Sequence, residues 1–189
     1  MNLKELKKRV DQALNDCQNL INQNPSAILS EADFERILSG YITTRIGYVP
    51  MNPIPDCFSV HTQISHYQQD NSKVDVRVDI LLFKGDQMLP SDANKGFYFE
   101  GDSLAIELKY LHTNNYQGIV QKDFDKEDKI GNDSWLYIVV LLDSNDNTAF
   151  LTKKKEIKEM WKNQIANSNC KGKLFCKVLK KELPSKKGE

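Results

Sequence analysis

The chain lacks the features that mark several common classes of protein. Lys plus Arg and Asp plus Glu are equal at 26 each among its 189 residues, so no excess of positive charge indicates a nucleic-acid partner. The longest apolar run, residues 135–142, is far shorter than the ~20 residues of a membrane helix, and the N-terminus has no apolar signal region. We therefore expect a cytoplasmic protein that does not enter a membrane.

Cysteine is also scarce, and its spacing excludes two kinds of site. No two of the four cysteines form a C-x-x-C pair, so neither a zinc knuckle nor a redox-active dithiol is indicated. We expect ordinary thiols at Cys17, Cys57, Cys170 and Cys176, without a disulfide framework. An apolar fraction of 40% and a charged fraction of 28% are typical of a single globular domain.

Hydrophobic periodicity predicts the order of the secondary-structure elements. A stripe of apolar residues at helical spacing predicts a first helix over residues 3–21, and Ser30 to Asp33 resembles a capping box that starts a second helix. Strands are expected at 57–67, 73–83 and 97–110, with a turn at 68–72 and a polar connection at 85–96. A helix over 115–130, a strand over 134–142, a helix over 152–168 and an edge strand over 174–183 follow.

These elements predict one α/β domain over residues 1–183. It comprises an N-terminal helical extension (1–29), a core (30–143) and a C-terminal helix and strand (144–183). A helix between two strands is typical of a parallel crossover, so the sheet should be mixed. The tail at 184–189 is expected to be disordered.

Two charged residues interrupt an otherwise apolar strand at 104–110. Glu107 and Lys109 are two positions apart, so their side chains leave the same face of the strand. Because an unpaired buried charge costs roughly several kcal/mol, other groups must compensate these charges. In the preceding strand, Asp79 stands where a half-exposed segment runs into the apolar residues 80–83. An acid at this point could join Glu107 in a carboxylate site with an adjacent cation.

Asp79 followed by Glu107-Leu108-Lys109 resembles the motif of the PD-(D/E)xK nuclease superfamily, which has the restriction-endonuclease-like fold. The order of helix, three strands, helix and strand over residues 30–143 is similar to the core of that superfamily. The proline of the motif is missing, because Val78 precedes Asp79. The resemblance implies a restriction-endonuclease-like mixed β-sheet flanked by helices. It also implies a metal-dependent phosphodiester hydrolase that cuts nucleic acid, DNA in preference to RNA.

The resemblance further implies roles for individual residues. Asp79 and Glu107 would hold Mg²⁺ or Mn²⁺, with help from the main-chain carbonyl of Leu108. Lys109 would assist the attacking water. Glu31 would complete the metal shell, and helical geometry makes it the acid of the second helix best aimed toward the apolar face.

Each assignment has an alternative. Gln121 matches a helix Gln or Lys found near the site in some superfamily members, but its helical angle is off the apolar face, which favours a solvated side chain. Asp79 could be a solvated strand residue, and Glu31 an acid favoured by the helix dipole. Glu107 and Lys109 could form a buried ion-pair network in a structural protein. A noncatalytic nucleic-acid-binding or protein-interaction domain that retains the nuclease fold is another class, and a homodimer is compatible with either.

Overall fold

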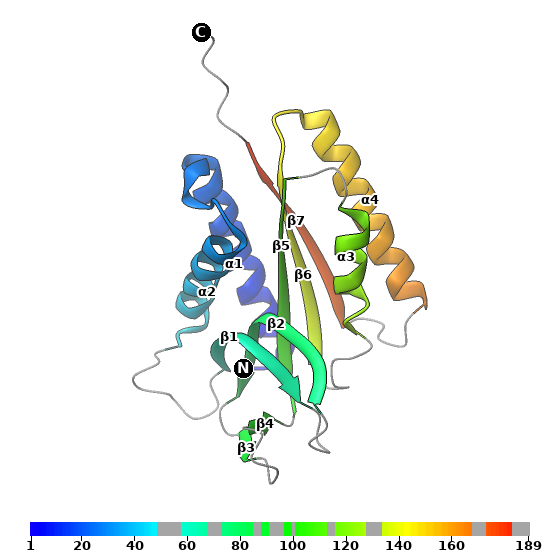
Figure 1. Ribbon diagram of the computed structural model, residues 1–189. Coiled ribbons are helices and arrows are strands. Elements are labelled where there is room, and N and C mark those ends of the chain that lie inside the picture. Colours follow the sequence, from blue (N-terminus) through cyan, green and yellow to red (C-terminus); the bar gives the residue numbers. More distant parts are fainter. Residues whose placement is uncertain are drawn as a thin grey trace.

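A mixed five-stranded sheet lies between two pairs of helices in the computed structural model of the protein (Figure 1). The structure describes residues 1–48, 58–67, 73–84, 88–90, 97–99, 101–112, 116–127, 134–167 and 173–182. The helices are α1 (Leu3–Gln23), the short 3-10 helix η1 (Pro25–Ala27), α2 (Glu31–Ile46), α3 (Gln117–Phe124) and α4 (Asn147–Asn167). The strands are β1 (Phe58–Tyr67), β2 (Lys73–Lys84), β3 (Met88–Pro90), β4 (Phe97–Phe99), β5 (Ser103–Leu111), β6 (Ser134–Asp143) and β7 (Leu174–Lys181).

The strand order in the main sheet is β1-β2-β5-β6-β7. The first three strands are antiparallel neighbours, whereas β5, β6 and β7 are parallel. Parallel neighbours need crossover connections, and α3 and α4 lie within these two connections. The α/β class, the mixed sheet and the edge position of the last strand are therefore confirmed.

The helices cover both faces of this sheet (Figure 1). Helices α1 and α2 lie on one face, and α3 and α4 lie on the other. The alternation along β5 divides its side chains between the two cores: Ile106 and Leu108 pack with α1 and α2, whereas Ala105 packs with Phe124 and Ile157 of α3 and α4. Glu107 and Lys109 consequently project toward the α3 side.

Capping interactions fix where α2 starts and ends. The hydroxyl of Ser30 accepts a hydrogen bond from the N–H of Asp33 at 3.1 Å, as the sequence predicts, so Glu31 is the first residue of the helix. Gly47 ends the helix with φ 71, a left-handed conformation that glycine adopts without steric cost. The cap at Ser30 thereby places Glu31 in the first turn of α2.

Some element boundaries differ from those that the sequence predicts. Helix α4 starts at Asn147 rather than near residue 152, because the carboxylate of Asp146 caps it by accepting from the N–H of Thr148 at 2.7 Å. The strand predicted over 97–110 is divided into β4 and β5 before and after Gly101, whose φ is 97.

The segment predicted as a polar connection also contains structure, because β3 pairs with β4 as a separate antiparallel hairpin. Helix α3 is shorter than predicted at its described end, where it gives way to a turn after Phe124. The expected turn at 68–72, the tail at 184–189, Cys57 and Cys170 lie outside the described residues. Among the helices that are described, none combines the length and apolar character needed to cross a membrane.

Burial on both sides of the sheet predicts where a truncation is costly. Ile138 of β6 is fully buried against the α3 and α4 layer. Ile138→Ala should lower the free energy of unfolding by about 2–5 kcal/mol, because it removes buried methylenes and leaves a cavity. Leu151→Ala is the control: this side chain is 53% exposed and its truncation should change stability by less than about 0.5 kcal/mol. Urea denaturation measures both, and equal effects would contradict the described packing.

Candidate functional site

Strand β2 leaves β5 beside the Glu-x-Lys segment. The pairs between these strands run from Phe83 and Ser103 to Ile80 and Ile106, and the described ladder ends there. The residues of β2 that precede Ile80 are paired with β1 alone in the described ladders. The edge of β5 that follows Ile106 consequently has main-chain N–H and C=O groups that need partners other than a neighbouring strand.

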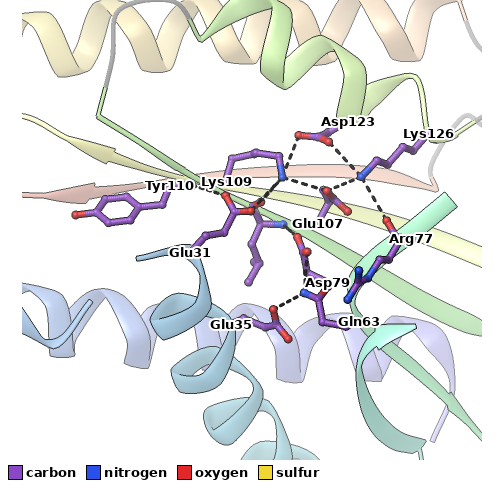
Figure 2. Close-up of polar contacts among 11 residues, drawn as sticks. Glu31, Glu35, Gln63, Arg77, Asp79, Glu107, Lys109, Tyr110, Asp123 and Lys126 are labelled. Carbon is purple, nitrogen blue, oxygen red and sulfur yellow. Dashed lines mark hydrogen bonds and ion pairs between the residues drawn. The ribbon is translucent and has the colours of Figure 1, made fainter. Parts of the chain in front are cut away.

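Acidic side chains from two different elements bind this free edge (Figure 2). Asp79 Oδ2 accepts a hydrogen bond from the N–H of Leu108 at 2.7 Å. Glu31, at the start of α2, accepts from the N–H of Tyr110 at 3.2 Å through Oε2. Alternate N–H groups of a strand point to the same side, so the two carboxylates take neighbouring positions that β2 would otherwise fill.

The ammonium group of Lys109 lies among the predicted metal ligands. Its Nζ is 2.8 Å from the carbonyl oxygen of Leu108, 3.1 Å from Glu107 Oε1 and 3.4 Å from Glu31 Oε1. It is also 3.8 Å from Asp123 Oδ2. Three of the four residues expected to hold a metal ion therefore contact this one cation.

A second lysine, which the sequence analysis did not identify, reaches the same acids. Lys126 follows α3, and its Nζ is 2.5 Å from Glu107 Oε1 and 3.3 Å from Asp123 Oδ1. It also donates to the main-chain carbonyl of Arg77 at 3.4 Å. The α3 side of the site thus contributes one buried acid and one cation to the cluster.

Gln121 is not brought into the cluster. Its side-chain amide donates to Asp125 at 2.8 Å and to Gln164 of α4 at 3.2 Å. Asp123 instead lies on the buried face of α3 next to Phe124, with only 3% of its surface exposed. A carboxylate on an apolar helix face is the sequence signal that could have identified this residue.

Both oxygens of Asp79 are held in place. Gln63 of β1 donates to Asp79 Oδ1 at 3.3 Å and to Glu35 of α2 at 2.5 Å, while Leu108 binds the other oxygen of Asp79. Gln63 has φ 57, a left-handed conformation that is uncommon for residues other than glycine. This amide connects β1, β2 and α2 on the side of the site opposite Lys126 (Figure 2).

Burial and crowding of charge shift the protonation equilibria of the site. Burial, with repulsion from Asp79, raises the pKa of Glu107 to about 7, although Lys109 and Lys126 act in the opposite direction. Burial likewise raises the pKa of Asp123, again against the two lysines. Burial alone would lower the pKa of Lys109, but the surrounding carboxylates, Asp123 and Glu107 foremost, outweigh it and raise the pKa. Lys109 is consequently a stable positive charge.

A second polar cluster ties the start of α2 to the ends of the parallel strands. The buried ammonium of Lys181 in β7 donates to the carbonyl of Ile28 at 2.6 Å and to the hydroxyl of Tyr110. That hydroxyl donates to Asp143 Oδ2 at 3.2 Å, and the same oxygen accepts from His112 Nδ1 at 2.5 Å. The segment that leads into Glu31 is thereby fixed against β5 and β7.

Within the described ranges, no three His, Cys, Asp or Glu side chains converge closely enough to form a metal site on their own. Ammonium groups lie between the carboxylates instead, at Lys109 and Lys126. Comparisons of the chain with protein-family models, curated proteins and solved structures found no match. A functional interpretation consequently depends on the motif and on this geometry.

The raised pKa of Glu107 predicts that the contribution of this residue to stability falls as the pH rises. Between pH 4.5 and about 7 the folded protein keeps a proton on Glu107 that the unfolded chain releases, so this group's contribution to stability is lost across that range. Glu107→Gln has no carboxyl group at this position to ionise, so this pH-dependent decrease should be absent from the variant. The free energy of unfolding of the variant should therefore rise relative to that of the wild type by on the order of 1–3 kcal/mol as the pH increases.

Urea denaturation at a series of pH values, in buffer without divalent ions, measures this difference. Glu159→Gln is the matched control, because this side chain is exposed on α4, and its difference from wild type should not change with pH. A difference between Glu107→Gln and wild type that stays constant with pH would contradict the raised pKa.

Proposed function

We propose that the protein is a divalent-metal-dependent phosphodiester hydrolase of the PD-(D/E)xK type that cuts nucleic acid, DNA in preference to RNA. The observation that carries the proposal is the convergence of Asp79, Glu31 and the Glu107-Leu108-Lys109 segment at the point where β2 leaves β5. Apart from the β3–β4 hairpin, the order α2, β1, β2, β5, α3 and β6 is the one that the resemblance to the superfamily implies, which supports the proposal of a restriction-endonuclease-like core.

The donor atoms of the proposed site are oxygen atoms, the ligand type that a hard divalent cation prefers, although the acids would have to move closer together to bind it. Glu107 Oε2 is buried and has no hydrogen-bond partner among the described residues, which is costly for a carboxylate unless a cation binds it. Asp79, Glu107, Glu31 and the carbonyl of Leu108 would hold Mg²⁺ or Mn²⁺, whose preferred ligands are oxygen atoms. A bound ion would polarise the phosphate and lower the pKa of its coordinated water.

Lys109 would act on charge that develops during the reaction. Its side chain is only 17% exposed and its ammonium is surrounded by carboxylates, so it stays protonated. A protonated lysine cannot serve as a general base, but it can donate to the nucleophile or to a phosphate oxygen that gains negative charge. We therefore assign Lys109 an electrostatic role.

Substitution of Lys109 separates catalysis from a structural ion-pair network. Lys109→Met keeps the apolar stem, and Glu107 keeps Lys126 as a partner, so the variant should fold. Cleavage should fall by about 100-fold or more, the size expected for loss of a positioned electrostatic group. Lys162→Met, which removes an exposed lysine of α4, should cut at the wild-type rate.

Gel assays with plasmid, linear duplex, single-stranded DNA and RNA, each in Mg²⁺ and in Mn²⁺, measure these rates. The nuclease proposal fails if the wild type cuts none of these substrates or if Lys109→Met retains the wild-type rate. It also loses its basis if the main effect of Lys109→Met is loss of folding, since breaking a buried ion pair alone costs roughly 3–5 kcal/mol.

Asp79→Asn should have opposite effects on the protein with and without metal. Without metal it removes a charge that repels Glu107, so the melting temperature should rise. With millimolar Mn²⁺ the variant should gain less stability than the wild type, because it has lost an anionic ligand and ion binding stabilises only the folded state. Thermal denaturation measures both. Asp102→Asn, at an exposed position, serves as control.

A further inference from the structure

Asp123 is a buried acid that the motif does not account for. It shares both ammonium groups of the site with Glu107. Lys109 Nζ is 3.1 Å from Glu107 Oε1 and 3.8 Å from Asp123 Oδ2, and Lys126 Nζ is 2.5 Å from Glu107 Oε1 and 3.3 Å from Asp123 Oδ1. Figure 2 shows both lysines in contact with both acids, and the distances place both ammonium groups nearer to Glu107. Each lysine therefore has a close carboxylate partner and a more distant one.

The charges of the cluster are unequal in number. Four carboxylates, Asp79, Glu107, Glu31 and Asp123, contact either the two ammonium groups or the free edge of β5. Above about pH 7, where Glu107 is ionised as well, two positive charges cannot neutralise the negative charge of these acids. A divalent cation would supply the missing charge, provided that the lysines remain in the site instead of being expelled to solvent.

The lysines cannot keep their present contacts beside such a cation. An ion held by Glu107 and the carbonyl of Leu108 would repel ammonium groups that contact the same oxygens. The other acid within reach of both is Asp123. Because charge-assisted hydrogen bonds are about 2.7–2.9 Å long, a movement of about 1 Å by Lys109 and less by Lys126 would complete both contacts.

We propose that Asp123 is a positioning residue that receives the ammonium groups of Lys109 and Lys126 when a divalent ion binds Glu107. This inference rests on the proposed function. In the metal-free protein the two lysines act as substitute cations for the metal ligands. In the metal-bound protein Asp123 retains them next to the ion, where Lys109 can act on the reacting phosphate and Lys126 provides a second positive charge.

The proposal makes the effects of two substitutions on metal affinity interdependent. In Asp123→Asn the lysines lose their alternative carboxylate and compete more strongly for Glu107, so binding of the ion should weaken. In Lys126→Met one competitor is gone, so binding should tighten. Asp123→Asn should consequently weaken metal binding less in the Lys126→Met background, because fewer ammonium groups then need an alternative acceptor.

Titration calorimetry with Mn²⁺ and no nucleic acid tests this coupling. The Kd should rise by about tenfold in Asp123→Asn and fall by about threefold in Lys126→Met, and Asp123→Asn should cost about threefold or less in the Lys126→Met background. Asp125→Asn and Lys122→Met are matched controls, because both residues are exposed near the same end of α3. Neither control should change the Kd by more than about twofold.

Several results would overturn the proposal. An undiminished effect of Asp123→Asn in the Lys126→Met background would make Asp123 a direct ligand or a simple source of negative charge. An Asp123→Asn variant that binds Mn²⁺ like Asp125→Asn would also overturn it. If the wild type binds no Mn²⁺, both this inference and the proposed function fail. If the wild type binds Mn²⁺ but the two substitutions are not coupled, only this inference fails.

A second measurement covers the case in which Asp123→Asn does not fold. Nuclear magnetic resonance spectra of the lysine ammonium groups follow the wild type directly during titration with Mg²⁺, and Lys109→Met and Lys126→Met assign the two signals. Both Nζ signals should shift in proportion to ion occupancy and stay protected from solvent exchange. Signals that do not shift, or that lose protection as they would on release to solvent, would overturn the role of Asp123.

Discussion

The main-chain hydrogen bonds that β5 loses when β2 turns away determine the arrangement of the charged groups. Leu108 and Tyr110 present their N–H groups to an edge without a strand, and carboxylates from β2 and α2 fill the vacant positions. An ordinary ladder would have satisfied these groups with neutral carbonyls. Charged acceptors form stronger hydrogen bonds, and they also bring negative charge to a place that the fold has partly withdrawn from water.

The concentration of charge then explains the rest of the site. Carboxylates held by the strand edge repel one another, and the two lysines reduce this repulsion without removing it. Helix α3 adds one negative and one positive charge to the site, since it carries Asp123 and leads into Lys126. Such an arrangement is poorly optimised for stability alone, because hydrophobic residues of similar volume often stabilise a core better than ion pairs do. The proposed divalent cation would offset the repulsion that remains.

The sequence was sufficient to predict the parts of the site that follow local periodicity. Alternation along β5 put Glu107 and Lys109 on one face, and helical angles together with the cap at Ser30 oriented Glu31. The order of the elements and the mixed sheet followed from the apolar runs in the same way. Each of these inferences needs only the neighbouring residues.

Other parts depended on contacts that no local pattern contains. The reach of Lys126 to Glu107 depends on where α3 ends, and the sequence predicted a longer helix. Gln63 contacts Asp79 through a left-handed backbone conformation that nothing in its own segment indicates. Gln121 was matched to a role by its position in the order of elements, but its helical angle directs it toward α4.

The hydrogen bond from Lys181 to the carbonyl of Ile28 has a consequence for folding during synthesis of the chain. These residues are 153 positions apart, and their contact fixes the segment that carries Glu31. A ribosome delivers β7 last among the described strands, so a growing chain already contains the acids and both lysines while the support for α2 is still missing. This support for the segment before Glu31 is therefore added only after synthesis of the last described strand.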